Sequence, residues 1–136
     1  MLSVFCALRA ADSPLLEGAE FRAAVSLGNL AGKALGRVKH PTLKRPDKNG
    51  VERAVFVPDN EPAGDGDFAI IPVPAAVHEL VLLGDGDSEP LFTRLALERA
   101  GKRFSRAYPW LTIGLHMAAP GFDFNDMWRA RQKEVA

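Results

Sequence analysis

Short apolar runs, separated by turn-forming residues, recur along the whole chain. The run over 81–83 is apolar at every position, which is typical of a strand buried on both faces in a parallel sheet. Four further runs are short, apolar and bounded by glycine, proline or polar residues, as strands are. They predict strands over 21–27, 54–57, 68–71 and 111–117.

Helical spacing alternates with these runs. Leu91, Leu95 and Ala96 fall on one face of a helix predicted over 91–102, and Arg94, Glu98 and Arg99 are expected to face outward. Other predicted helices span 2–10, 30–35 and 123–135, the second of them closed by Gly36. Strands alternating with helices predict an α/β fold with a mainly parallel sheet.

The segments between these elements are rich in turn formers. Residues 12–18 and 58–67 contain glycine and proline and are predicted as loops. Residues 40–50 are basic and turn-rich. Within them Asn49-Gly50, between Lys48 and Val51, is a strong signal for a hairpin turn.

Composition adds limits rather than detail. A chain of 136 residues, 47% apolar and 25% charged, is expected to form one globular domain. The single cysteine, Cys6, excludes an internal disulfide and fits a reducing cytoplasm. No apolar run approaches membrane-spanning length. Residues 1–11 are mildly apolar but lack the basic n-region that precedes the apolar core of a signal peptide. We therefore expect a cytoplasmic protein without a membrane partner.

Charge is unevenly distributed although the net charge is zero. Seven Lys or Arg residues fall between Lys33 and Arg53, whereas 54–93 contains eight Asp or Glu and no Lys or Arg. Such runs often form a solvated surface. The alternative is an acidic metal pocket flanked by a basic surface for a phosphate backbone. Lys39, Lys44 and Arg45 are the candidate nucleic-acid contacts.

Asp85 and Asp87 carry the most informative chemistry. They directly follow the buried run over 81–83, at the edge of the sheet where open α/β folds bind ligands. Two neighbouring carboxylates repel each other unless a cation or a proton lies between them. A hard cation, Mg²⁺ or Mn²⁺, is therefore the expected ligand.

A second acidic motif, Asp123-Phe-Asn-Asp126, follows the last predicted strand. Asp123 is a natural N-cap for the final helix. In a parallel sheet this loop lies at the same edge as Asp85 and Asp87, so Asp123 or Asp126 could complete a metal site.

Two other acidic strings compete with this assignment. Asp59 and Glu61 follow the apolar run over 55–57, and residues 64–67 repeat the Gly-Asp-Gly-Asp of residues 84–87. We favour Asp85 and Asp87 because their preceding strand is more apolar and a convincing helix follows.

With these motifs in place, the chain resembles the Toprim domain of phage- and plasmid-type primase–helicases. The resemblance covers about residues 1–130 and rests on three stretches, 24–30, 79–93 and 120–127; the segment 37–78 resembles a family insertion containing a hairpin or loop. It implies a Toprim-like (Rossmann-like), mainly parallel sheet flanked by helices. It also implies that Asp85 and Asp87 hold Mg²⁺, with further charge from Asp123 and Asp126.

The chain also departs from the family pattern. Toprim domains begin with a strand ending in Glu-Gly, whose glutamate is the presumed general acid/base. Here that strand and glutamate are expected to be missing, and Glu17-Gly18 is a poor substitute because only two residues separate it from Phe21. A sheet lacking that strand exposes a parallel edge, which a second copy of the chain or another protein is expected to cover.

Three functions remain open. The favoured one is a Toprim remnant, non-catalytic alone, that binds nucleic acid or a protein, for example as a phage or mobile-element inhibitor of a host defence complex. The alternatives are a Mg²⁺-dependent nucleotidyl-transfer (primase) module for DNA replication and a nuclease of the same fold. Both need the missing glutamate from a longer chain or a partner.

Overall fold

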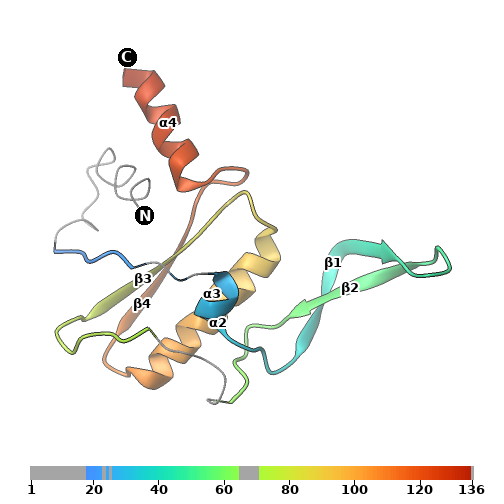
Figure 1. The fold of residues 1–136 in the computed structure, drawn as a ribbon, viewed down its shortest axis with the longest axis horizontal. Coiled ribbons are helices and arrows are strands. Elements are labelled where there is room, and N and C mark those ends of the chain that lie inside the picture. The colour runs from blue at the N-terminus through green and yellow to red at the C-terminus, as the bar shows by residue number, and fades with distance from the viewer. Residues whose placement is uncertain (1–17, 23, 25, 65–70, 136) are drawn as a thin grey trace.

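A computed structural model describes residues 18–22, 24, 26–64 and 71–135 of the chain (Figure 1). The described part is an α/β structure with two separate two-stranded sheets. Its elements, in chain order, are α2 (Leu27–Ala31), β1 (Arg37–Pro46), β2 (Glu52–Pro58), β3 (Glu79–Gly84), α3 (Pro90–Ala107), β4 (Thr112–Met117) and α4 (Phe124–Val135).

The centre of the molecule is a β3–α3–β4 unit. β3 and β4 pair in parallel, in a register that runs from Glu79 opposite Thr112 to Gly84 opposite Met117. Parallel neighbours need a crossover connection, and the 18-residue helix α3 provides it. The predicted strands over 81–83 and 111–117 and the predicted helix over 91–102 are therefore confirmed, and α3 continues five residues further, to Ala107.

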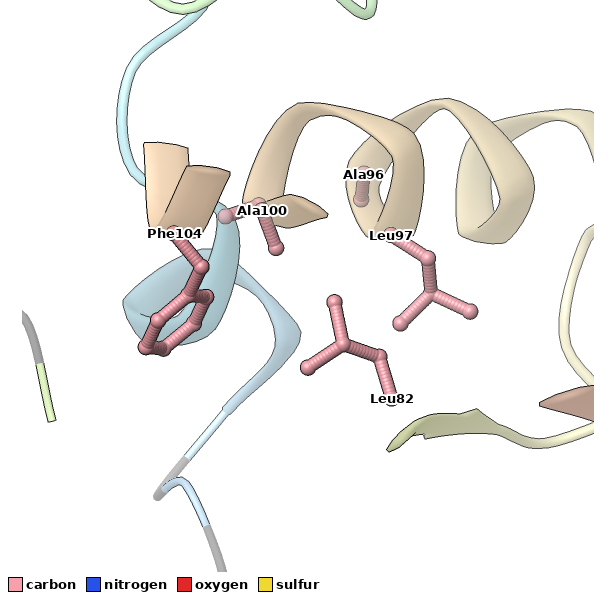
Figure 2. Packing of buried hydrophobic residues seen from close by; sticks show 6 residues of the cluster. Leu82, Ala96, Leu97, Ala100 and Phe104 are labelled. Carbon is pink, nitrogen blue, oxygen red and sulfur yellow. The ribbon is translucent and has the colours of Figure 1, made fainter. Parts of the chain in front are cut away.

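The core lies between α3, β3 and α2. Figure 2 shows Leu97 and Phe104 of α3 beside Leu82 of β3, and small Ala96 and Ala100 let the elements approach closely. Leu97 and Phe104 are the largest fully buried side chains among the described residues. Burying a side chain of this size contributes about 1.5–3 kcal/mol.

β1 and β2 form an antiparallel hairpin, here called the arm (residues 37–58), that extends away from the β3–α3–β4 unit (Figure 1). Its turn is closed by bonds from the Asp47 N–H to the Val51 carbonyl and from the Gly50 N–H to the Asp47 carbonyl, each 2.9 Å. Gly50 has φ +78°, which glycine adopts without strain. The hairpin turn predicted at Asn49-Gly50 and the strand predicted over 54–57 are confirmed.

Three local predictions are wrong. The described residues within 21–27 do not form a strand, because the Ser26 hydroxyl accepts from the Asn29 N–H and starts helix α2 at Leu27. Gly32, with φ +65°, ends that helix before the predicted Gly36. The basic stretch over 40–50 is mostly strand rather than turns. The helix predicted over 2–10, the loop residues 12–17 and most of the strand predicted over 68–71 lie outside the described residues.

The predicted α/β fold class is confirmed, but the described residues form one parallel and one antiparallel pair of strands, and the antiparallel pair lies within the segment 37–78, which is predicted to contain a hairpin or loop. The arm pairs only with itself in an antiparallel ladder, and the parallel sheet there consists of β3 and β4. A turn short enough to join β1 and β2 directly allows only antiparallel pairing, whereas each parallel pair needs its own crossover helix. The fold class is therefore α/β with mixed pairing.

The second edge of β3 pairs with no strand among residues 18–64 and 71–135. A cavity of about 960 Å³ runs along it. Residues of β3 line this cavity together with apolar side chains that include Leu27, Leu30, Ile71 and Val73. Covering of this edge by a partner stays a prediction. None of the described helices has the length and apolar character needed to cross a membrane.

Candidate nucleic-acid interface and metal-binding loop

The loops that follow β3 and β4 are held together by their backbones. The Gly86 N–H donates to the Phe122 carbonyl at 3.0 Å, and the Gly121 N–H donates to the Gly86 carbonyl at 2.8 Å. A third bond, from Ala118 N–H to the Gly84 carbonyl, measures 2.9 Å. The two acidic motifs therefore lie on adjoining loops at the carboxyl edge of β3 and β4, as the sequence predicts.

The two glycines of the Gly-Asp-Gly-Asp string have packing roles. A Cβ on Gly84 would lie 2.6 Å from Leu97 Cδ1 and 2.7 Å from Met117 Sδ. A Cβ on Gly86 would lie 2.2 Å from the Ala119 carbonyl oxygen, which cannot move without breaking the contact between the loops. Both positions therefore need glycine for α3 and the neighbouring loop to approach.

The two aspartates of the same string have no such role. Asp85 and Asp87 are exposed. Neither has a hydrogen bond or an ion pair with any described residue. Their carboxylates are thus free to bind a cation from solvent.

Asp123 and Asp126 are instead engaged at the start of α4. Asp123 Oδ1 accepts from the Asp126 N–H at 2.6 Å, and Asp126 Oδ2 lies 3.5 Å from the Asp123 N–H. This reciprocal arrangement is a capping box, and both carboxylates also complement the positive end of the helix dipole. The N-cap predicted at Asp123 is confirmed.

These donors fit a magnesium ion only in part. Among the described residues, no three His, Cys, Asp or Glu side chains gather closely enough to hold a metal ion. Mg²⁺ nevertheless often binds through one or two carboxylates and keeps several waters. Asp85 and Asp87 can supply that minimal set, and a cation held there would offset the charge of a bound phosphate. The metal site predicted from the sequence at Asp85, Asp87, Asp123 and Asp126 stays a prediction.

Replacing Asp85 and Asp87 together with asparagine is expected to weaken Mn²⁺ binding at least tenfold, because the two carboxylates of this loop that have no partner among the described residues are removed. Isothermal titration of Mn²⁺ into both proteins measures the difference. The matched control, Glu52→Gln with Glu79→Gln, removes two exposed carboxylates elsewhere. Equal affinity in wild type and the Asp85/Asp87 variant would show that this loop is not the metal site.

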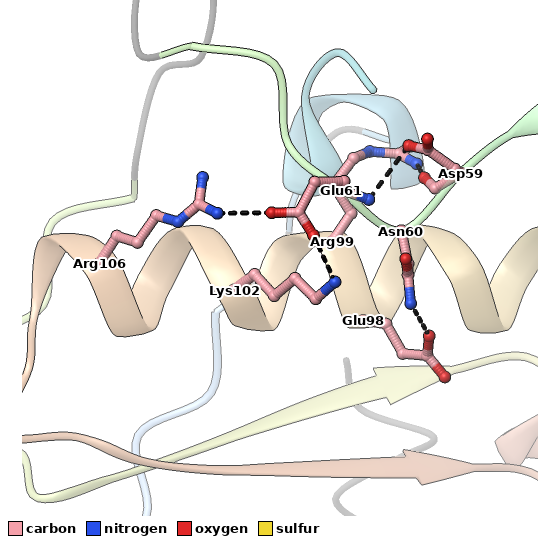
Figure 3. Close-up of polar contacts among 7 residues, drawn as sticks. All are labelled: Asp59, Asn60, Glu61, Glu98, Arg99, Lys102 and Arg106. Atoms are coloured by element: carbon pink, nitrogen blue, oxygen red, sulfur yellow. Dashed lines mark hydrogen bonds and ion pairs between the residues drawn. The ribbon is translucent and has the colours of Figure 1, made fainter. Parts of the chain in front are cut away.

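The competing acidic string binds α3 (Figure 3). Glu61 accepts from Lys102 Nζ and from Arg106 Nη2, each at 2.6 Å. The hydrogen bond from Lys102, followed by that from Arg106, holds the pKa of Glu61 below its usual value. Asn60 donates to Glu98 at 2.7 Å in the same cluster. Glu61 thus fastens the chain after the arm to the helix, and Asp65 and Asp67 lie outside the described residues.

Two buried arginines of α3 hold both ends of the arm. Arg99 donates to the carbonyls of Gly32, before β1, and Asp59, after β2. Arg103 donates to the carbonyls of Lys33 and Ala63 at 3.3 and 3.1 Å. Arg99 was predicted to face solvent, and its 4% exposure shows that this prediction is wrong. The segments that flank the arm, 32–36 and 59–63, are here called the arm root, and they lie against a second face of α3.

His40 makes a further connection between the arm and α3. The backbone N–H groups of Thr42 and Leu43 donate to its Nδ1 at 3.2 and 2.9 Å, so the ring proton belongs on Nε2, which lies 2.9 Å from Glu89 Oε1. Burial raises the pKa of Glu89, but the bonds from His40 and from the α3 N–H groups outweigh it and lower that pKa overall. Glu89 caps α3 and fixes the arm through one carboxylate.

The arm itself is strongly basic. Between Arg37 and Pro58 it has six Lys or Arg against two acidic residues, a net charge of +4. Asp47 pairs with Arg53 at 3.1 Å, and Glu52 lies 3.8 Å from Lys44. Within the described residues, Lys39, Arg45 and Lys48 have no acidic partner. All three predicted nucleic-acid contacts, Lys39, Lys44 and Arg45, are exposed on this arm.

Register places an aromatic ring among these cations. Lys39 lies directly opposite Phe56, and the neighbouring pairs on the same face are Arg37 with Pro58 and Lys44 with Ala54. Phe56 is half exposed. This grouping could not be predicted from the sequence, because three extra residues in β1 between Lys39 and Lys44 shift the register. Strict alternation would have put Lys39 and Lys44 on opposite faces.

Comparison with known proteins identifies no relative. No protein-family model matches the chain, and no curated protein or solved structure is significantly similar to it.

Proposed function

We propose that this protein binds nucleic acid through the arm. The observation that carries the proposal is a two-stranded ribbon with exposed Lys39, Lys44 and Arg45, fastened to α3 at its root. Cations on a fixed ribbon neutralise backbone phosphates and release condensed counterions, which is the main source of non-specific affinity. A protein without net charge gains such affinity only where its cations are concentrated.

The resemblance to Toprim domains belongs to this proposal. It is supported by the order of β3, the Asp-x-Asp loop, α3 and β4, with Asp85 and Asp87 exposed at the carboxyl edge. In this proposal the chain is non-catalytic alone, because the sequence is expected to lack the glutamate that ends the first strand of Toprim domains. The exposed aspartate pair favours the second candidate function, metal-dependent nucleotidyl transfer completed by a longer chain or a partner.

The salt dependence of binding tests the proposal. Affinity for a fluorescein-labelled 20-nucleotide DNA is measured by anisotropy at several NaCl concentrations. Each phosphate neutralised on a single strand contributes about −0.7 to the slope of log K against log salt. Three arm contacts predict a slope of about −2 or steeper. Absence of binding at low salt, or an affinity independent of salt, would contradict the proposal and direct attention to protein partners.

A further inference from the structure

Resting on the proposed nucleic-acid function, we infer that the arm binds single strands, with one unpaired base stacked on Phe56. The face around this ring combines a π surface with positive charge on both sides along the ribbon. Arg37 donates through Nη2 to the Phe56 carbonyl at 2.9 Å, which keeps its guanidinium beside the aromatic residue. Lys39 lies opposite the ring, and Lys44 comes next along the same face.

Space for a base exists at this position. Phe56 is 50% exposed, and no ring contact involves it within the described part of the chain. Its same-face neighbours along β2 are Ala54 and Pro58, and Ala54 is too small to cover the ring. Val57, the next residue, is 8% exposed and faces the opposite side of the ribbon. Val57 is therefore the side chain of β2 that is buried in the protein, whereas the Phe56 side chain remains half exposed.

The exposed ring favours a single strand over a duplex. In a duplex the faces of the bases are covered by their neighbours in the stack, so an aromatic side chain reaches the face only of an unstacked base. Successive same-face pairs on a ribbon are about 7 Å apart, since each strand residue advances about 3.3 Å. Arg37, Lys39 and Lys44 thus lie where phosphates on either side of that base can be contacted. Aromatic side chains bind such bases through their faces without regard to sequence.

Phe56→Leu tests the stacking contact, because leucine keeps an apolar side chain but removes the ring. Stacking of one base is worth about 5- to 150-fold in affinity. We expect Phe56→Leu to lose about tenfold or more for a 20-nucleotide single strand, with duplex affinity and the salt slope unchanged. Phe56→Tyr should retain wild-type affinity. The matched control, Val51→Ala, truncates another half-exposed apolar residue of the arm and should bind as wild type does.

A spectroscopic readout separates stacking from a general loss of arm structure. In Phe56→Trp, addition of single-stranded DNA should quench the fluorescence in excess of any change in wild type, which contains Trp110 and Trp128. Full affinity of Phe56→Leu for single strands, with a normal salt slope, would overturn the stacking inference and leave the proposed function intact. A wild-type protein that binds neither single strands nor duplex would reject the proposed function itself.

Discussion

Changing Lys39, Lys44 and Arg45 together to glutamine is expected to weaken binding of single-stranded DNA by about 10²–10³-fold at roughly 50 mM salt. Each lost phosphate contact removes the release of about 0.7 counterion, which at that salt concentration corresponds to about an eightfold loss. The slope of log K against log salt should fall in magnitude by about 2. Anisotropy titrations of both proteins across a salt series measure the two quantities.

The chain offers a control with the same change in net charge. Arg94, Arg129 and Lys133 are exposed on α3 and α4, outside the arm, and their triple change to glutamine also removes three positive charges. If binding depends on the arm, this control should lose less than about threefold, because charges that do not contact the bound strand are screened within about 10 Å at ordinary salt. Similar losses in the two triple variants would mean that overall charge, not the arm, determines affinity.

Prediction from the sequence succeeded where a single local pattern determines the element. The continuous apolar run before Asp85 specifies β3, and the spacing of Leu91, Leu95 and Ala96 specifies α3. Asp123 and the Asn49-Gly50 turn are equally local signals, and the structure confirms both. Prediction failed for 21–27, where an apolar run suggested a strand but a hydroxyl at Ser26 caps a short helix.

The burial of Arg99 could not be predicted because it depends on contacts distant in sequence. A helical pattern shows which face is apolar, and Arg99 lies beside that face among charged residues. The carbonyls it binds belong to Gly32 and Asp59, which come together only when the arm forms. The position of Phe56 among cations could not be predicted for a similar reason. Its neighbours Lys39 and Lys44 are set by the pairing of β1 with β2 and by the bulge in β1.

The acidic loop shows a different limit. The sequence placed Asp85, Asp87 and the later acidic motif at one edge, and the backbone bonds between the two loops agree. The sequence could not show that the carboxylates of Asp123 and Asp126 bond to backbone N–H groups in a capping box, because aspartate serves equally well as an N-cap and as a metal ligand. Only the structure separates the free carboxylates from the engaged ones.

Arg99→Met is expected to lower the free energy of unfolding by about 3 kcal/mol, because the carbonyls of Gly32 and Asp59 lose a charged donor inside the protein. Burial lowers the pKa of Arg99, Asp59 partly opposes this, and the guanidinium still remains protonated. Methionine keeps the length of the stem, so cavity formation adds little. For a chain of this size the expected fall in Tm is roughly 10 °C, measured by circular dichroism.

Arg94→Met on the same helix is the matched control for Arg99. Its side chain is exposed and pairs with Glu98 at 3.4 Å, so the expected loss is below about 0.5 kcal/mol. The rate of cleavage by trypsin is a second measurement, because it reports detachment of the arm, whose Lys and Arg residues are trypsin sites. If Arg99 holds the arm root, Arg99→Met should be cut within 37–58 faster than wild type at 25 °C, below its Tm. Equal stability and equal cleavage in the two variants would show that the arm is held without Arg99, and that its orientation depends on Arg103, Glu61 and His40 instead.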